Sequence, residues 1–234
     1  MLFKKKKDTN LNDHPGLVVL NRPTSVVSEQ FRTIRTNIQF SMIDETLKTI
    51  VVTSAGPSAG KSTVAANLSA TLASDDKRVL LVDADLRKPT VHKTFNIRNS
   101  DGLTKLLTDR TSKLEDVIYR THTEGLYLLT SGAIPPNPAE LLSSKRMSEV
   151  IKEMGQYFDM IIFDMPPVLA VTDAQVLSSK VDGVLFVIPK GEVSKDQIIK
   201  SKELLENVKA NVLGAVLNKV EKSEDNYYYY YGEE

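Results

Sequence analysis

A loop of small residues, SAGPSAGKST at 54–63, lies between a short apolar run and a helix-like segment. The apolar run TIVVT at 49–53 is rich in β-branched residues, which favours a buried strand. Small residues let successive backbone N–H groups wrap a phosphate at the amino end of the next helix, where the helix dipole attracts an anion. The sequence therefore predicts a strand–loop–helix unit that binds a phosphorylated ligand.

The side chains of this loop predict ATP with Mg²⁺ as the ligand. Lys61 can bridge the β- and γ-phosphates, and the Ser62 hydroxyl can bind Mg²⁺. Ala55 stands where the strict P-loop pattern has glycine, which is tolerated as long as its backbone needs no positive φ. The residues expected to bind ATP are Gly56, Pro57, Ser58, Ala59, Gly60, Lys61, Ser62 and Thr63.

The rest of the chain alternates between strand-like and helix-like segments. Strands are predicted, several of them as unbroken apolar runs, at 49–53, 79–82, 126–130, 160–163, 184–188 and 212–217. Helices are predicted at about 61–74, 138–155, 172–180 and 193–209. This alternation predicts an α/β fold with a doubly wound, mostly parallel sheet flanked by helices. Ligands of such sheets bind at the carboxyl ends of the strands, where the P-loop also lies.

Three aspartates follow two of the predicted strands. Asp83 and Asp85 come after VLLV at 79–82, and Asp164 comes after MIIF at 160–163. Taken singly, each can simply mark a strand ending at a turn. Beside a triphosphate, carboxylates can hold Mg²⁺ and accept the proton of an attacking hydroxyl. The predicted catalytic residues are therefore Lys61, Asp83, Asp85 and Asp164, with Ser62, Asp83 and Asp164 as metal ligands; spacing leaves open whether Asp83 or Asp85 is the base.

Composition excludes several other kinds of protein. The chain has 234 residues, no cysteine and three histidines without ligand spacing, which argues against disulfides, thiolate catalysis and a zinc site. Thirty basic residues balance thirty acidic ones, so no charge excess points to nucleic acid as a partner. No apolar run approaches the roughly 20 residues that span a bilayer, and the expected location is the cytoplasm.

The two ends of the chain differ in composition from the middle. Residues 1–24 are polar and are expected to form an extended arm, whereas residues 25–220 are expected to form one domain. The last stretch, 221–234, reads EKSEDNYYYYYGEE and predicts a flexible, disordered tail.

Residues 25–42 predict a helix at the start of this domain. Its apolar side chains recur at helical spacing and form one narrow stripe of Val27, Phe31, Ile34 and Ile38. Glu29, Arg32 and Arg35 lie off this stripe and are therefore available to a neighbour; a local Glu29–Arg32 ion pair is the alternative.

These motifs together resemble the bacterial tyrosine kinases, in particular the separate kinase subunit of Gram-positive capsule and exopolysaccharide clusters. The Walker A loop corresponds to 55–63, the motif D-x-D-x-R to Asp83, Asp85 and Arg87, and the Walker B motif to Asp164 and Pro167. The helical motif E-x-x-R-x-x-R and the tyrosine cluster correspond to Glu29, Arg32, Arg35 and to Tyr227, Tyr228, Tyr229, Tyr230 and Tyr231.

The resemblance implies a protein-tyrosine kinase that phosphorylates its own tyrosine cluster in trans and regulates polysaccharide synthesis. It implies a ring-like homo-oligomer with Glu29, Arg32 and Arg35 at the subunit contact. It also implies a contact of Asn218 with adenine, for which a simple turn at the end of the last strand is the alternative. It also implies a separate transmembrane activator, or polysaccharide co-polymerase, that recruits the kinase to the inner face of the membrane. Further protein substrates and a phosphatase are expected partners.

Two other functions fit parts of the sequence. An ATPase switch of the partitioning or division-site type shares the fold and the carboxylates, but usually carries a second lysine five residues before Lys61, where this chain has Gly56. A module that only senses ATP and regulates a partner is the other alternative. Nucleotide-dependent partner binding that survives loss of Asp83 and Asp85 would support it.

Overall fold

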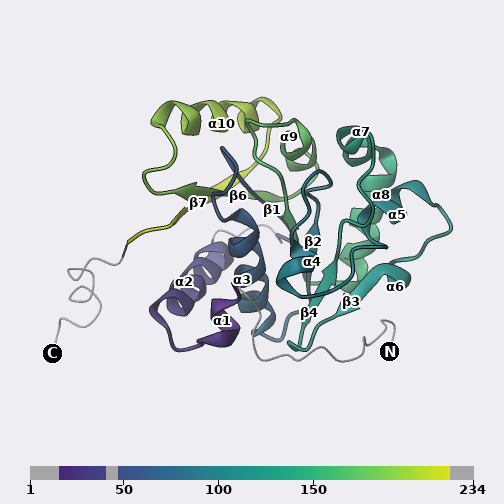
Figure 1. Ribbon diagram of the computed structural model, residues 1–234, viewed down its shortest axis with the longest axis horizontal. Helices are drawn as coiled ribbons and strands as arrows, with labels where there is room; N and C mark the ends of the chain where they lie inside the picture. Colours follow the sequence, from purple (N-terminus) through teal and green to yellow (C-terminus); the bar gives the residue numbers. More distant parts are fainter. Residues whose placement is uncertain (1–15, 41–46, 222–234) are drawn as a thin grey trace.

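The computed structural model describes residues 16–40 and 47–221. Their strands form one sheet in the order β3-β4-β2-β5-β1-β6-β7 (Figure 1). The strands are β1 (Thr49–Ser54), β2 (Val79–Asp83), β3 (Ile118–Arg120), β4 (Leu126–Leu129), β5 (Met160–Asp164), β6 (Gly183–Pro189) and β7 (Val212–Asn218). All neighbouring pairs are parallel except β3 with β4. The predicted α/β fold with a mostly parallel sheet is confirmed.

Helices cover both faces of this sheet. On one face, α3 (Lys61–Ala73) packs on β1, β2 and β5, and α1 (Val18–Asn21) and α2 (Val26–Phe40) pack on α3 (Figure 1). The other face carries α8 (Lys145–Tyr157) on β5 and α9 (Asp173–Ser178) on β1, with α10 (Lys195–Asn207) against α9. The shorter helices are α4 (Val91–Thr94), α5 (Leu103–Thr108), α6 (Leu114–Val117) and α7 (Pro138–Ser143).

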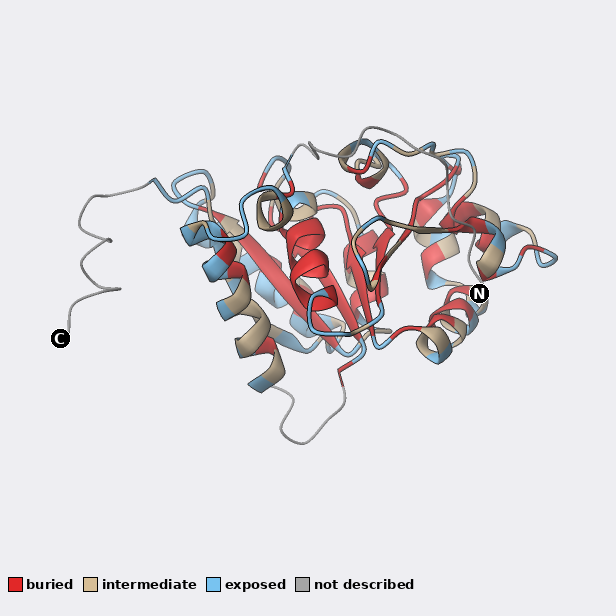
Figure 2. Ribbon diagram, turned by 90° about the horizontal axis from the view of Figure 1, so that it is seen from below, coloured by how far each residue is buried: buried red, intermediate tan, exposed pale blue. Residues whose placement is uncertain are grey.

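The central strands are buried on both faces because successive side chains point to opposite sides of a strand. In β1, Val51 contributes to the core under α8 and α9, whereas Ile50 and Val52 contribute to the core under α3. Figure 2 shows the same pattern, with buried strands and a buried inner helix between more exposed outer elements. This double burial explains why the strands read as unbroken apolar runs.

Two predictions about local structure were wrong. The single helix predicted over 138–155 is two helices, because Ser144 leaves the helical conformation and its hydroxyl accepts a hydrogen bond from Met147 N, which starts α8. The edge strand β3 was not predicted. It has only three residues, which is too short for a periodic pattern, and it pairs antiparallel with β4.

The expectation of an extended arm is wrong for residues 16–24. Leu17 is fully buried, and residues 18–21 form α1. Asn67 of α3 holds this segment, since its side chain accepts from Val19 N at 3.1 Å and donates to Gly16 O at 2.6 Å. The segment was missed because a few apolar residues among polar ones carry no clear period. Residues 1–15 of the predicted arm and 222–234 of the predicted tail lie outside the described residues.

The predicted helix at 25–42 is confirmed as α2 over Val26–Phe40. Phe31 and Ile38 of the expected apolar stripe are buried, but Val27 at the start of the helix is exposed. The Ser25 hydroxyl accepts a hydrogen bond from Ser28 N at 3.2 Å and so satisfies a donor of the first turn. Within the two described ranges, no helix has the length and apolar character needed to cross a membrane.

Candidate active site

The P-loop connects β1 to α3 at the carboxyl edge of the sheet. Gly60 precedes the first helical residue with φ 84°, and Ser58 also has a positive φ of 61°. Glycine reaches this region without strain, whereas a serine there is uncommon. Ala55 is buried and is not among the residues with positive φ, so alanine fits where the strict pattern has glycine. The predicted phosphate-binding context of strand, loop and helix is present.

Asn218 at the end of β7 contacts this loop directly. Its Nδ2 donates a hydrogen bond to Ala59 O at 2.8 Å. A Cβ atom on Gly60 would lie 2.2 Å from the same Nδ2, so the close approach of Asn218 requires glycine at 60. The expected contact of Asn218 with adenine stays a prediction, because what is seen is a contact with the loop backbone.

Two of the three aspartates contact Lys61, and the third, Asp83, lies beside Asp164. Asp83 of β2 and Asp164 of β5 are direct neighbours in the strand register, which brings two fully buried carboxyl groups side by side. Lys61 Nζ lies 3.4 Å from Asp85 Oδ2 and 3.7 Å from Asp164 Oδ1. The lysine therefore contacts one carboxylate that follows β2 and one that ends β5, both at the carboxyl edge of the sheet.

Asp83 and Asp85 each have one oxygen fixed by backbone donors. Asp83 Oδ2 accepts from Thr90 N and Val91 N, both at 3.0 Å. Asp85 Oδ1 accepts from Lys88 N at 2.9 Å and from Arg87 N at 3.3 Å. The second oxygen of Asp83 is buried without a hydrogen-bond partner, and that of Asp85 faces Lys61. Both carboxylates are thus oriented with one oxygen left for chemistry.

Burial governs the protonation of this cluster. Burial, followed by the charge of neighbouring Asp164, raises the pKa of Asp83 to about 8. Burial also raises the pKa of Asp164, against the opposing effect of the positive charge on Lys61. Carboxyl groups that are costly to ionise alone are suited to a site that receives a cation.

The donor set of this cluster fits Mg²⁺. Both oxygens of Asp164 and Oδ1 of Asp83 are buried without hydrogen-bond partners. The Ser62 hydroxyl belongs to the same cluster, 3.4 Å from Lys61 Nζ. In residues 16–40 and 47–221 no group of three His, Cys, Asp or Glu forms a metal cage. Mg²⁺ at nucleotide sites is held by one or two carboxylates together with phosphate oxygens and water.

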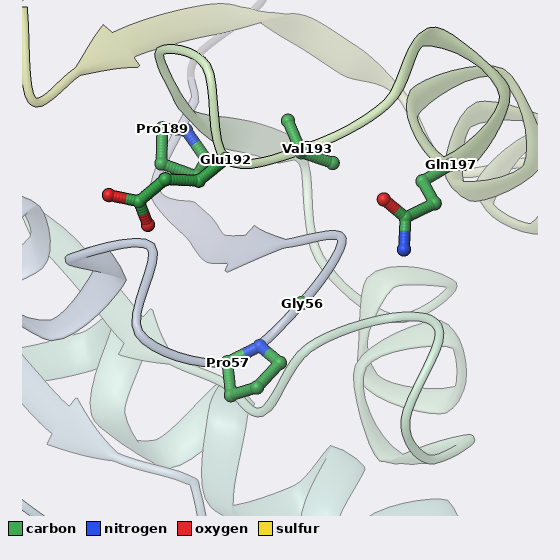
Figure 3. A pocket seen from close by; sticks show the side chains of 6 residues that line it. All are labelled: Gly56, Pro57, Pro189, Glu192, Val193 and Gln197. Atoms are coloured by element: carbon green, nitrogen blue, oxygen red, sulfur yellow. The ribbon is translucent and has the colours of Figure 1, made fainter.

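A pocket of about 250 Å³ lies beside the P-loop (Figure 3). Gly56 and Pro57 form one wall, and the segment from the end of β6 to α10 forms the other with Pro189, Glu192, Val193 and Gln197. Glu192 also accepts from Lys219 Nζ at 2.7 and 2.9 Å, which ties the residue after β7 to the pocket rim. The position next to the P-loop suits the nucleoside part of a bound nucleotide.

The residues of this second wall, and Asp173, were not predicted from the sequence. Pro189, Glu192, Val193 and Gln197 belong to no motif. Their nearness to the P-loop follows only from β6 pairing with β1. Arg87 of the motif D-x-D-x-R forms an ion pair with Asp173 through two hydrogen bonds at 2.8 and 2.9 Å. These hydrogen bonds raise the pKa of the Arg87 guanidinium.

The three charged residues of the α2 motif E-x-x-R-x-x-R make different contacts. Arg32 forms an ion pair with Glu29 and donates to Pro23 O at 2.7 Å. Glu29 is exposed, whereas Arg32 is half-buried. Arg35 instead donates to Thr71 O at 3.3 Å and to Ser74 Oγ at 3.4 Å, at the carboxyl end of α3. Arg35 therefore has partners inside its own chain, at a helix end that attracts cations. The predicted role of Glu29, Arg32 and Arg35 at a subunit contact stays a prediction.

Comparisons with known proteins agree with this site. The AAA domain family matches residues 47–222. Tyrosine-protein kinase YwqD of Bacillus subtilis (strain 168) is 46% identical over 232 residues, which cover 99% of this chain and 97% of YwqD. The solved kinase domain of Escherichia coli tyrosine kinase ETK superposes with a TM-score of 0.86 at 32% identity, covering 94% of this chain and 85% of that one.

A division-site ATPase shares the fold more distantly. The septum site-determining protein MinD of Pyrococcus horikoshii OT3, solved with Mg-ADP, gives a TM-score of 0.63 at 28% identity, covering 76% of this chain and 72% of MinD. Both identity and coverage are lower than for the kinases. With near-complete coverage of a kinase at 46% identity, the chain belongs to the family of bacterial tyrosine-protein kinases.

Proposed function

We propose that this chain transfers the γ-phosphate of ATP to tyrosine hydroxyls, including those of Tyr227–Tyr231. The observation that carries the proposal is the meeting of Lys61 with the carboxylates of two strands beside a P-loop. The family of the chain supports the same reaction. The tyrosines themselves lie outside the described residues, so their role rests on their place in the sequence and on the family resemblance.

The reaction needs charge stabilisation and a proton acceptor. A bond forms between the tyrosine oxygen and the γ-phosphorus, while the bond from that phosphorus to the bridging oxygen of ADP breaks. Lys61 neutralises charge on the β- and γ-phosphates as it develops, after leaving its contacts with Asp85 and Asp164. The proton of the tyrosine, whose ordinary pKa is near 10, passes to Asp85 Oδ2 after Lys61 has left it, or to Asp83 Oδ1 where that oxygen does not hold the metal.

Asp164, Asp83 and Ser62 are the residues that would hold Mg²⁺. The unpartnered buried oxygens of the two carboxylates support this assignment. When bound, Mg²⁺ supplies further neutralisation of the phosphate oxygens. Pro57 and Val193 provide apolar contact for the nucleoside, with Asn218 joining the adenine side of the site from β7. The solved complex of MinD with Mg-ADP supports nucleotide and metal in this fold.

The tail is proposed to reach the site of a neighbouring copy. From Lys219 onward, 16 residues fully extended span roughly 50 Å. In a ring of copies, Glu29, Arg32 and Arg35 of α2 are proposed to form the subunit contact, supported by the exposure of Glu29 and the partial exposure of Arg32. Phosphate on the acidic tail would add about −1.5 to −2 charges per tyrosine and repel other tails, loosening the ring.

Transfer between copies is tested by mixing two variants. Lys61→Met keeps the tyrosines but lacks the lysine, and a variant with Tyr227–Tyr231 changed to phenylalanine keeps the lysine but lacks acceptors. With Mg-ATP, phosphotyrosine is expected in the mixture but in neither protein alone. Any tail phosphotyrosine must then reside on the Lys61→Met chain. A mixture without it, alongside a phosphorylated wild type, would rule out transfer in trans.

The cellular setting follows from the same family resemblance. The kinase is proposed to work in the cytoplasm, recruited to the inner face of the membrane by a separate transmembrane protein that activates it. Its proposed role is to regulate capsule or exopolysaccharide synthesis, with a phosphatase reversing the modification. An ATPase switch is the second candidate, because MinD shares the fold. Steady ATP hydrolysis without phosphotyrosine would favour that candidate.

A further inference from the structure

Asp173 is a fully buried acid that belongs to neither the P-loop nor the three carboxylates. It is the first residue of α9, and its carboxylate accepts two hydrogen bonds from the Arg87 guanidinium at 2.8 and 2.9 Å. A buried carboxylate is costly unless it is paired and hydrogen-bonded. A two-pronged arginine contact fixes direction as well as distance. The contact therefore holds Arg87 in a defined place.

Arg87 in turn belongs to the turn that orients Asp85. Arg87 N and Lys88 N both donate to Asp85 Oδ1, which leaves Asp85 Oδ2 facing Lys61 at 3.4 Å. The backbone ladder between β2 and β5 continues as far as the bond from Ala84 N to Asp164 O. Beyond that bond, the Arg87–Asp173 pair connects the Asp85 turn to the β5 side of the site.

Asp173 stands on a segment that is itself fixed to the P-loop. Between β5 and α9, Val168 N donates to Ser54 O at 2.8 Å, and Thr53 Oγ1 donates to Pro166 O at 2.8 Å. The β1 and β5 loops are thus joined by these hydrogen bonds. The Arg87–Asp173 ion pair connects the loop after β2 to these two loops. The segments that carry Lys61, Asp85 and Asp164 are therefore all linked to one another.

We propose that Asp173 is a positioning residue for phosphoryl transfer, which acts through Arg87 to hold the Asp85 turn against the P-loop. The proposal rests on the proposed function, because it assumes that Asp85 takes part in the reaction. Asp173 itself touches neither nucleotide phosphate nor tyrosine. Loss of the pair leaves the P-loop intact and loosens the carboxylate that must face the reacting group.

The test compares kcat and KM for Mg-ATP in autophosphorylation by the full chain. Asp173→Asn keeps the side-chain shape but removes the charge, and we expect kcat to fall roughly tenfold to hundredfold. KM should stay within about threefold, because binding by the P-loop is retained. Arg87→Lys keeps the positive charge but cannot donate two parallel hydrogen bonds to Asp173. Its kcat should fall less than that of Asp173→Asn, and its KM should again change little. Asp173→Glu should restore part of kcat.

A matched control exists at the other end of the same two strands. Arg78 and Asp159, which precede β2 and β5, form an ion pair at 3.4 Å far from the P-loop edge. Asp159→Asn is expected to keep the wild-type kcat. A folded Asp173→Asn protein with wild-type kcat, or one whose KM rises as much as kcat falls, would overturn the proposal.

The experiment also separates failure of the positioning role from failure to fold and from failure of the proposed function. If Asp173→Asn fails to fold, Arg87→Lys decides, and a wild-type kcat there overturns the proposal. A wild type that forms no phosphotyrosine overturns the proposed function and this inference with it. An active wild type beside a fully active Asp173→Asn protein overturns the positioning role alone.

Discussion

Replacing Lys61 with methionine is expected to lower tyrosine phosphorylation by roughly a thousandfold or more while the protein remains folded. Lys61 Nζ is the cation between Asp85 and Asp164 in the described site, at 3.4 and 3.7 Å. Methionine fills a similar volume but cannot neutralise the charge that develops on the transferring phosphate. Binding of Mg-ATP should weaken less than the rate, because the backbone N–H groups of the loop remain.

The measurement is the initial rate of phosphotyrosine formation, with folding checked by thermal unfolding. Lys105→Met is the matched control, because Lys105 also pairs with an aspartate, Asp101, but on an exposed helix surface. That variant is expected to keep the wild-type rate. A Lys61→Met protein with more than a tenth of the wild-type rate would show that the lysine does not carry charge stabilisation.

Replacing Asp83 with asparagine is expected to have opposite effects on stability and activity. The folded-state pKa of Asp83 is about 8 against an ordinary 3.8, so the folded protein binds this proton more tightly than the unfolded chain. The stability contributed by this proton is therefore fully present below pH 3.8 and is lost as the pH rises toward 8 and through it.

An asparagine side chain at this position cannot ionise, so the free energy of unfolding of the Asp83→Asn protein should change much less with pH between about 5 and 8.5. Asparagine can still accept from Thr90 N and Val91 N and can donate to the adjacent Asp164. At about pH 8, without nucleotide and Mg²⁺, the Asp83→Asn protein should be more stable than wild type. Its phosphorylation rate should nevertheless fall by roughly a hundredfold or more, because an acceptor or metal ligand is gone.

Denaturant unfolding across this pH range measures the stability effect. Asp109→Asn is the control, because hydrogen bonds from Thr111 lower the pKa of exposed Asp109 and it titrates below the range. The control should keep the wild-type pH dependence. If the free energy of unfolding changed with pH in the same way for wild type and the Asp83→Asn protein, the assignment of the raised pKa to Asp83 would be contradicted.

The sequence predicted the parts of this site that depend on short stretches of chain. Lys61 follows a strand and opens a helix, and Asp83 and Asp164 end apolar strands. In a parallel sheet those carboxyl ends lie on one edge, so local patterns sufficed to bring the three residues together. The unbroken apolar runs predicted the central strands for the same reason, since both faces of the sheet are buried.

What the sequence did not predict depends on pairs far apart in the chain. Arg87 and Asp173 are separated by 86 positions, and no spacing rule connects a strand-end turn to the start of a later helix. The pocket wall formed by Glu192 and Gln197 depends on β6 lying beside β1. Arg35 contacts the end of α3, and this contact cannot be predicted from the sequence of its own helix.

The most direct test of the kinase assignment is to map phosphate after incubation with Mg-ATP. Purified wild type and the Lys61→Met protein are compared, alone and with the cytoplasmic segment of a candidate membrane activator, and modified residues are identified by mass spectrometry. If the chain is a tyrosine kinase, we expect phosphate on Tyr227–Tyr231 of the wild type and none on the Lys61→Met protein. Hydrolysis of ATP without phosphotyrosine under both conditions would contradict it and favour an ATPase switch.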